Sequence, residues 1–319
     1  MCLKQKLTTL PAALGLALLA AACKSDRPAD TVRADSAAAP ADPMAKRVAT
    51  AEQLENPEAA RYDPDLDLWF IANVNGPPAA KDRNGYISRL RSDGTVDSLK
   101  FIAGGARGVT LHSPKGMAIV GDTLWVADVD AVRAFNKRTG APVATVDLKG
   151  RAKFLNDVAT GPDGIYVTDS GLEGEKLDHT GPDQVFRVAN RKATVALKLQ
   201  NLAAPNGITW DSASSRFVIV PFGAKSIVTW APGDSVPTPL LEGTGQYDGV
   251  EPLGHGRFLI TSWVDSSLGL LADGRITRLA GDLPGPADIG LDRKTGRVAV
   301  PLLLNNRVEF LDLPPASTR

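Results

Sequence analysis

The sequence predicts an all-β fold, a six-bladed β-propeller, and three observations lead to this prediction. A short sequence motif, which consists of a turn and a strand and is followed about ten residues later by an apolar run, occurs six times. The copies are separated by roughly 40 to 57 residues, which is the period of propeller blades. The apolar runs are nearly continuous instead of alternating, as expected for strands that are packed on both faces. The clearest copy is Pro205-Asn206-Gly207-Ile208, followed by Phe217-Val218-Ile219-Val220.

Length and composition agree with one closed ring. A chain of 319 residues could hold two domains, but a single blade cannot bury both of its faces and needs a neighbour on each side. The 30 Gly and 23 Pro suit a protein rich in turns, and no long helical periodicity is present. Lys plus Arg equals Asp plus Glu at 36 each, so no basic field is available and nucleic acid is not an expected partner.

The N-terminus predicts export. Residues 1–22 read as a signal peptide, with Lys4 and Lys6 before an apolar stretch that is too short to span a bilayer. Small residues run directly into Cys23, which resembles a bacterial lipoprotein signal, in which that cysteine becomes the lipidated first residue. The alternative is an ordinary secretory signal that is cut near Ala22. Lys24 after the cysteine resembles the outer-membrane sorting pattern, so we expect a lipoprotein anchored in the outer membrane on its periplasmic or extracellular face.

The remainder divides into a tether and a propeller. Residues 23–45 are rich in Ala, Asp, Pro and Ser and predict a disordered tether, and residues 46–319 form the propeller domain. Blade 6 shows only three strands, so we expect residues 46–51 to supply its outer strand and close the ring; the alternative is an irregular segment. Residues 170–184 form a polar, Gly-rich insertion in blade 3, either a surface loop or a lid. The six blades are expected at residues 57–102, 113–148, 154–199, 204–241, 247–279 and from 286 onward.

One position of the repeat carries the candidate site. The innermost strand of each blade runs along the central channel, and the residue at its start is expected to point toward the axis. Four of the six residues in this slot are oxygen donors, which hard cations such as Ca²⁺ prefer, whereas His and Cys ligands are missing. Each donor alone would more often belong to a turn or a solvated surface, so the argument rests on the shared slot. The six residues are Glu58, Lys115, Asn156, Asn206, Asp248 and Ala287.

From about residue 54 to 312 the chain resembles the regucalcin–gluconolactonase superfamily of six-bladed propellers, with diisopropylfluorophosphatase and paraoxonase as more distant relatives. The resemblance implies that Glu58, Asn156, Asn206 and Asp248 surround a divalent cation, usually calcium. It also implies that the metal polarises the carbonyl of a lactone or related ester while the aspartate acts as base or nucleophile. The motifs that carry it are Pro57-Glu58 with Tyr62-Asp63-Pro64, Phe154-Leu155-Asn156-Asp157, Pro205-Asn206-Gly207 and Asp248-Gly249.

Two departures from the family pattern bear on function. Phe154 stands where sugar lactonases of this type often have an arginine, and Lys115 places a cation in the ring. Lys115 would either bind an anionic part of the substrate or neutralise the carboxylates in place of the metal. We therefore expect a monomeric, metal-dependent hydrolase of a small lactone or ester, with Asp248 and Lys115 in catalysis and Asn156 and Lys115 in substrate binding. The alternative is a non-catalytic propeller that binds a small ligand or a protein at the cell envelope, because fold alone does not decide function.

Replacing the predicted lipidation residue tests the predicted anchor. Cys23→Ala removes the thiol that would carry the lipid, so we expect the variant to leave the membrane fraction and appear in the soluble exported fraction. Cys2→Ala is the matched control, because Cys2 lies within the segment that is expected to be removed. Membrane association that is unchanged in Cys23→Ala would contradict the lipoprotein prediction.

Overall fold

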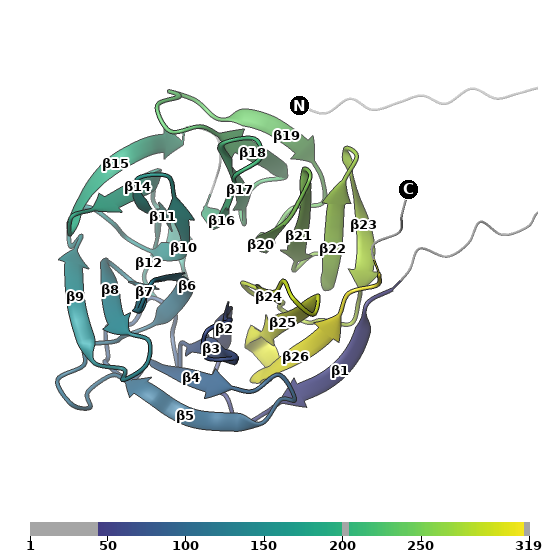
Figure 1. The fold of residues 1–319 in the computed structure, drawn as a ribbon. Helices are drawn as coiled ribbons and strands as arrows, with labels where there is room; N and C mark the ends of the chain where they lie inside the picture. Colours follow the sequence, from purple (N-terminus) through teal and green to yellow (C-terminus); the bar gives the residue numbers. More distant parts are fainter. Residues whose placement is uncertain (1–43, 200–203, 316–319) are drawn as a thin grey trace, which may run out of the picture. The chain divides into compact units, whose positions relative to one another are not determined.

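Each sequence repeat folds into one four-stranded antiparallel sheet, and six such sheets are arranged around a common axis (Figure 1). The computed structural model describes residues 44–199 and 204–315. Within these residues the strands are β1 to β26, and the one helical element is a single 3₁₀ turn, Leu303–Asn305. The predicted all-β, six-bladed propeller is therefore confirmed. None of the described helical residues forms a segment long and apolar enough to cross a membrane.

The strands of a blade follow one another from the axis to the rim (Figure 1). The innermost strands are β2 (Pro57–Asp63), β6 (Pro114–Val120), β10 (Leu155–Gly161), β16 (Pro205–Asp211), β20 (Tyr247–Gly254) and β24 (Gly290–Asp292). The second strands are β3 (Leu68–Asn73), β7 (Thr123–Asp128), β11 (Gly164–Asp169), β17 (Arg216–Pro221), β21 (Arg257–Ser262) and β25 (Arg297–Leu302). The third strands are β4 (Tyr86–Leu90), β8 (Ala131–Asn136), β14 (Asp183–Ala189), β18 (Ser226–Trp230), β22 (Ser267–Ala272) and β26 (Arg307–Asp312). The outer strands are β5 (Val96–Ala103), β9 (Pro142–Asp147), β15 (Lys192–Leu199), β19 (Thr238–Glu242), β23 (Arg275–Ala280) and β1 (Lys46–Ala51).

Blade 6 is assembled from both ends of the described chain. Its sheet has the order β1-β26-β25-β24, so the outer strand comes from residues N-terminal to blade 1. The register places Lys46 opposite Asp312 and Ala51 opposite Val308. The predicted signal peptide, Cys23 and the tether as far as residue 43 lie outside the described residues.

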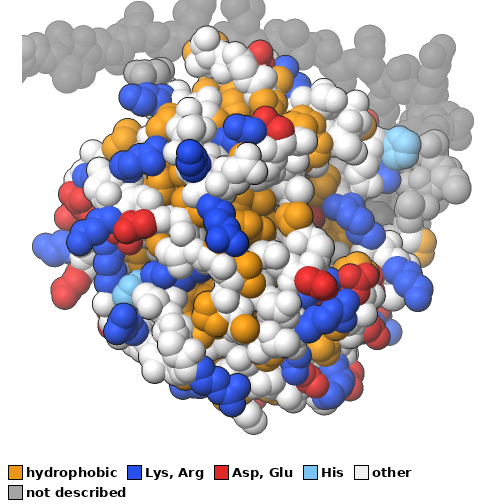
Figure 2. Space-filling model, turned by 60° about the vertical axis from the view of Figure 1, so that its left-hand side comes forward, with side chains coloured by type: hydrophobic (Ala, Val, Ile, Leu, Met, Phe, Trp, Pro, Cys, Tyr) orange, Lys and Arg blue, Asp and Glu red, His pale blue; other side chains and the backbone are white. Residues whose placement is uncertain are grey.

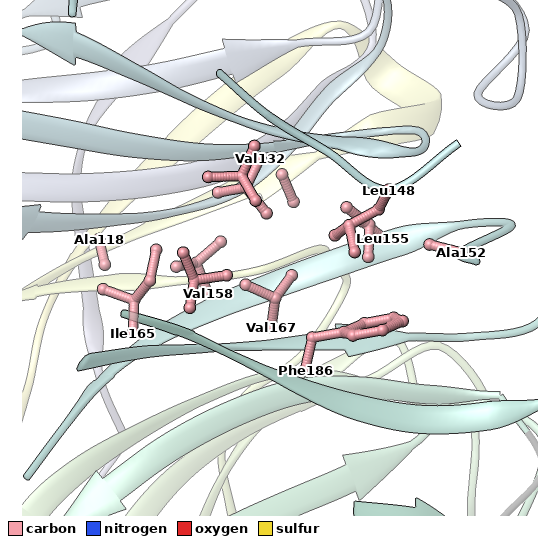
Figure 3. Close-up of a cluster of buried hydrophobic side chains, with 12 residues drawn as sticks. Ala118, Val132, Leu148, Ala152, Leu155, Val158, Ile165, Val167 and Phe186 are labelled. Atoms are coloured by element: carbon pink, nitrogen blue, oxygen red, sulfur yellow. The ribbon is translucent and has the colours of Figure 1, made fainter. Parts of the chain in front are cut away.

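Hydrophobic side chains fill the spaces between neighbouring blades. Six buried clusters are present, and each draws its members from two adjacent blades. Figure 3 shows the cluster between blades 2 and 3, in which Val132 and Leu148 face Val158, Val167 and Phe186. Because each inner blade surface is covered by the next blade, both faces of the second strands are apolar. This packing explains the continuous apolar runs in the sequence.

Threonine hydroxyls join neighbouring blades close to the axis. Thr168 Oγ1 on β11 accepts a hydrogen bond from the Asp157 amide at 2.9 Å and donates one to the Asn206 carbonyl of the next blade at 2.7 Å. Thr261 on β21 makes the same pair of contacts, from the Gly249 amide and to the Ala287 carbonyl. Each hydroxyl thereby satisfies one backbone donor and one backbone acceptor that would otherwise be buried without a partner.

The insertion in blade 3 forms a small hairpin. Its strands are β12 (Leu172–Glu173) and β13 (Asp178–His179), which pair with each other in a separate two-stranded sheet. The Lys153 ammonium contacts the hairpin through Glu173 at 2.9 Å and Thr180 at 2.5 Å. The insertion is thus attached to the link between blades 2 and 3.

Replacing Thr168 by valine should destabilise the protein by about 3 kcal/mol, because two buried backbone groups lose their partner at roughly 1–3 kcal/mol each. Valine keeps the shape and the β-propensity of threonine, so the loss reports the two hydrogen bonds. Thr160→Val, at an exposed position of the adjacent strand β10, is the control and should change stability little. Urea unfolding measures both variants, and equal stability of the two would contradict the proposed role of the hydroxyl.

Candidate functional site

Every innermost strand begins with a β-bulge. In blade 3, Leu155 is opposite Asp169 and Val158 is opposite Val167, so Asn156 and Asp157 together face the single residue Thr168. The register shifts in the same way at the start of the innermost strands of blades 1, 2, 4 and 5. In blade 6 the extra residue lies between the bridge at Pro286 and the pair formed by Gly290. A bulge adds one residue and redirects side chains, and the slot residues identified in the sequence lie in these bulges.

The predicted ligands are buried, and three of them carry oxygen atoms without a hydrogen-bond partner. Glu58, Asn156, Asn206 and Asp248 are each 7% exposed or less. Buried polar atoms normally have partners, yet the atoms without one include Glu58 Oε2, Asn206 Oδ1 and Asp248 Oδ1. These oxygens come from blades 1, 4 and 5.

Asp248 is held in place by an indole. Trp263, in the turn after β21, donates its Nε1–H to Asp248 Oδ2 at 2.9 Å, which leaves Oδ1 free. Burial raises the pKa of Asp248 to about 7, although the contacts from Trp263 and Asn206 act in the opposite direction. The pKa of Glu58 is raised well above its ordinary value, first by burial and then by the charge of Asp248. The two carboxylates therefore lie within electrostatic reach of each other.

Asn156 is oriented through a hydrogen-bond chain between blades 3 and 4. Its Nδ2 donates to Ser170 Oγ at 3.1 Å, and that hydroxyl donates to the Pro205 carbonyl at 2.7 Å. Pro205 immediately precedes Asn206, so the chain couples the two predicted amide ligands. Because its Nδ2 donates to Ser170, Asn156 keeps its Oδ1 available to contact a ligand.

The second position of the bulge supplies two further carboxylates. Asp157 Oδ1 accepts the amide of Val158 at 2.6 Å, and Oδ2 accepts the amide of Ile208 in the next blade at 2.8 Å. Gly116 has the same place in blade 2, and a Cβ there would lie 2.2 Å from Asp157 Oδ1, so only glycine leaves room for this carboxylate. Asp288 is the counterpart in blade 6, and its Oδ1 has no partner.

Arg61 connects an acidic residue further along the channel, Glu251, with Asp288 in the blade 6 bulge. Its guanidinium forms ion pairs with Glu251 and with Asp288, the latter at 3.3 Å. Glu251 lies on β20 and is also approached by Arg293 at 3.5 Å. Arg61 is the fifth residue of β2 and Glu251 the fifth of β20, so the pair bridges the channel further along the same innermost strands.

The buried charges at the axis do not balance. Five carboxylates, those of Glu58, Asp157, Asp248, Glu251 and Asp288, are at most 7% exposed. The cations among them are Arg61 and Lys115, so the fully ionised cluster would carry −5 + 2 = −3. Burial raises the pKa of Asp157 to about 6 and raises the pKa of Asp288 well above its ordinary value. Buried unpaired charge is costly, so the site either takes up protons or binds a cation.

Lys115 does not provide that cation by direct pairing. It is 1% exposed, and its Nζ donates to the Pro78 carbonyl at 2.9 Å and to the Ser113 carbonyl at 3.0 Å. The ammonium also lies 4.1 Å from the ring centre of Phe154. Within the described residues it forms no ion pair with Glu58 or Asp248. Burial lowers the pKa of Lys115 to about 8, and Glu58 opposes this change.

The donor set fits a hard cation better than a soft one. No group of three or more His, Cys, Asp and Glu side chains placed to hold a metal is found in the described ranges. The predicted set contains only two such residues, Glu58 and Asp248, and completes its ligands with the amide oxygens of Asn156 and Asn206. Carboxylate and amide oxygens together are the ligands of Ca²⁺, and three of the four residues have a buried oxygen to offer.

Comparison with solved structures shows that the fold occurs in another protein of known structure. A crystal structure of a protein provisionally described as a gluconolactonase superposes with a TM-score of 0.62 at 15% sequence identity. The alignment covers 86% of this chain and 93% of that chain. The chain has the fold of that protein. No protein-family model matches the sequence, and no curated protein matches it.

Several residues of the site were not identified in the sequence analysis. Asp157 and Asp288 were missed because one slot per blade was considered, whereas a bulge presents two consecutive residues. The sequence signal was the adjacent pair Asn156-Asp157 and the Asp that follows Ala287. Trp263 and Ser170 follow the second strands, and no repeat pattern singles them out.

Asp248→Asn should flatten the pH dependence of stability of the metal-free protein. The raised pKa of Asp248, about 7 against 3.8, means that ionisation opposes folding, so stability falls as pH rises from about 4 through 7. Asparagine removes this contribution, on the order of 4 kcal/mol at pH 8 for a shift of this size, and its oxygen can still accept from Trp263. Unfolding in urea with chelator at pH 5 and pH 8 measures the difference.

Glu242→Gln, on the exposed outer strand β19, is the matched control for that experiment and should keep the slope of the wild type. A slope for Asp248→Asn as steep as that of the wild type would show that the buried carboxylate does not ionise at a cost in the folded protein.

Proposed function

We propose that this protein is a hydrolase of a lactone or related ester that depends on a divalent cation, Ca²⁺, at the propeller axis. The observation that carries the proposal is the set of buried oxygens without partners, Glu58 Oε2, Asn206 Oδ1 and Asp248 Oδ1, in a cluster with excess negative charge. A bound divalent cation would offset that charge and satisfy those oxygens. The gluconolactonase fold supports the choice of reaction class.

The residues that would hold the cation are Glu58, Asn156, Asn206 and Asp248. Their backbones lie in the β-bulges of four different blades, and the blades are fixed against one another by the hydrophobic clusters and the threonine bridges. A rigid frame of this kind favours both metal binding and catalysis. When bound, the cation supplies Lewis-acid polarisation of a carbonyl oxygen.

Asp248 is the residue proposed to handle the proton. Trp263 holds Oδ2, so Oδ1 is the atom available to accept a proton from the attacking water. The hydroxyl of that water adds to the carbonyl carbon, the ring C–O bond breaks, and the proton passes to the departing alkoxide. The product is a hydroxy acid, so water and lactone are fully accounted for.

Lys115 and Phe154 distinguish this site from a sugar lactonase. Two of the three N–H groups of Lys115 are held by backbone carbonyls and its charge lies over the Phe154 ring. We propose that the fixed positive charge of Lys115 attracts an anionic group of the substrate or product to the blade 2 side of the propeller ring. The phenyl ring of Phe154 offers no hydrogen bond to a sugar hydroxyl.

Metal titration combined with a hydrolysis assay tests the proposal. Calcium should raise the melting temperature with its concentration, by the equivalent of about 2.7 kcal/mol at one hundred times the dissociation constant. Chelator should abolish lactone hydrolysis, and calcium should restore it. Asp248→Ala should lose both the stabilisation by calcium and the hydrolysis.

Glu242→Ala is the control, because it removes an exposed carboxylate of the outer strand β19 and leaves the axis untouched. If calcium changes neither the melting temperature nor the hydrolysis in the wild type, the metal-dependent hydrolase is excluded. The same face would then serve as a binding surface without catalysis.

A further inference from the structure

A second cavity opens at the end of the ring where the innermost strands begin. Its volume is about 370 Å³, and it is bordered by loops of blades 1, 2 and 3. These loops join second to third strands or link one blade to the next, so they lie at the same end of the blades as the bulges. Ala79, Val129, Lys153 and Gly174 represent the four segments that form the border.

The border of this cavity is positively charged. It contains four cations, Lys81, Lys149, Arg151 and Lys153, and two carboxylates, Asp130 and Glu173, so the net charge is 4 − 2 = +2. Lys81 pairs with Asp130, and Lys153 pairs with Glu173 at 2.9 Å. In the two described ranges of the chain, Lys149 and Arg151 have no acidic partner. Figure 2, which brings the side of blades 2 and 3 forward, shows Lys and Arg side chains interspersed with Asp and Glu side chains on that side of the molecule.

Two of these cations are set in place by their surroundings. Arg151 donates from Nη2 to the Ala193 carbonyl at 3.0 Å and lies 5.6 Å from the Phe186 ring centre, which leaves its remaining N–H groups free of protein partners among the described residues. Lys153 is held by Glu173 and by Thr180 of the β12–β13 hairpin. The insertion in blade 3 therefore forms one wall of the cavity.

The cavity adjoins the candidate site along two segments of backbone. Lys153 precedes Asn156 by three residues, which span at most about 10 Å of extended chain. Val129 forms a bridge with Leu155, the residue directly before Asn156. Ala79 follows Pro78, whose carbonyl accepts a hydrogen bond from the Lys115 ammonium. The cavity is thus bordered by residues that adjoin, in sequence or by a backbone bridge, the segments leading to Lys115 and Asn156.

The two regions carry opposite charge, and this opposition would orient a substrate. An anionic group is repelled by the carboxylates at the axis and attracted by the cations of the cavity. A molecule that has a neutral carbonyl at one end and an anionic group at the other would be held in one direction only. The charge of Lys115, which lies between the two regions in the chain's course from Pro78 to the axis, has the same sign as that of the cavity.

We propose that this cavity binds the anionic group, a carboxylate or a phosphate, of the lactone or ester whose carbonyl is attacked at the axis. The inference rests on the proposed function and adds the substrate class to it: anionic lactones or esters are preferred over neutral ones. Lys149 and Arg151 are the specificity-determining residues, and Lys153 supports them by holding the hairpin.

A matched pair of substrates tests the preference in the full chain with calcium. One is γ-nonalactone, which is neutral, and the other is its analogue with a carboxylate in place of the terminal methyl group of the side chain, so that several bonds separate the charge from the lactone ring. Lys149→Glu should lower kcat/KM for the carboxylate by about tenfold, the cost of losing one charge-assisted contact, and Lys149→Glu/Arg151→Glu should lower it further. Hydrolysis of the neutral lactone should be unchanged in both variants, and rising salt should reduce the preference of the wild type.

Lys192→Glu is the control, because Lys192 is exposed at the first position of β15, at the opposite end of blade 3. It should leave both substrates unaffected. Equal losses for the charged and neutral lactones, or no loss for either in Lys149→Glu, would overturn the proposal.

A binding measurement without turnover separates this proposal from the proposed function. Calorimetry with succinate and with inorganic phosphate, in the presence of chelator, reports the cavity alone and distinguishes the two kinds of anion. If no lactone is hydrolysed but either anion binds and Lys149→Glu weakens it about tenfold, anion recognition stands and the hydrolase is rejected. If neither anion binds, or binding does not respond to Lys149→Glu, the cavity does not recognise anions.

Discussion

The burial of several carboxylates at the ends of the innermost strands is the constraint on which the site depends. Each bulge turns one or two side chains toward the axis, and all six blades contribute an acid, an amide or a lysine there. The hydrophobic clusters between blades prevent these groups from moving apart to relieve repulsion. The propeller therefore holds charge in an arrangement that an isolated sheet could not maintain, and strain of this kind is characteristic of functional sites.

Acidic and basic side chains occupy different places at this end of the ring. The carboxylates at the axis come from blades 1, 3, 5 and 6, while the loops of blades 1, 2 and 3 contribute the cations of the cavity. Lys115 stands between them, with its charge held by Pro78, Ser113 and the Phe154 ring. The acids at the axis come from equivalent bulge positions and from the innermost strands, whereas the cations of the cavity come from loops that differ between blades, including the insertion in blade 3.

The sequence predicted the blades well and the site in part. A strand buried on both faces must be apolar throughout, so β3 at Leu68–Asn73 and β25 at Arg297–Leu302 were recognisable within a residue or two. The polar residues at the start of the innermost strands were found because they occupy the same position of the repeat in several blades. Asp157 and Asp288 were missed because one position per blade was considered, whereas each bulge presents two consecutive residues. The contact of Trp263 with Asp248 depends on how a turn folds back over its own blade, and the pair of Arg61 with Glu251 joins blades 1 and 5; neither follows from local pattern.

Trp263 shows how one blade of a repeated fold acquires a contact that the equivalent position of another blade lacks. Of the two predicted carboxylate ligands, Asp248 receives a fixed donor, whereas Glu58 has none at Oε2. A hydrogen bond to the ionised form lowers the pKa of a carboxylate, so the Trp263 indole opposes the rise that burial causes in the pKa of Asp248. For Glu58, burial and then the charge of Asp248 raise the pKa, and the charge of Lys115 opposes them. Two acids in equivalent bulges thus keep one unpaired oxygen each but differ in the groups that act on their ionisation. The division of roles between equivalent positions thus originates in the turn after the second strand, where the repeat is least strict.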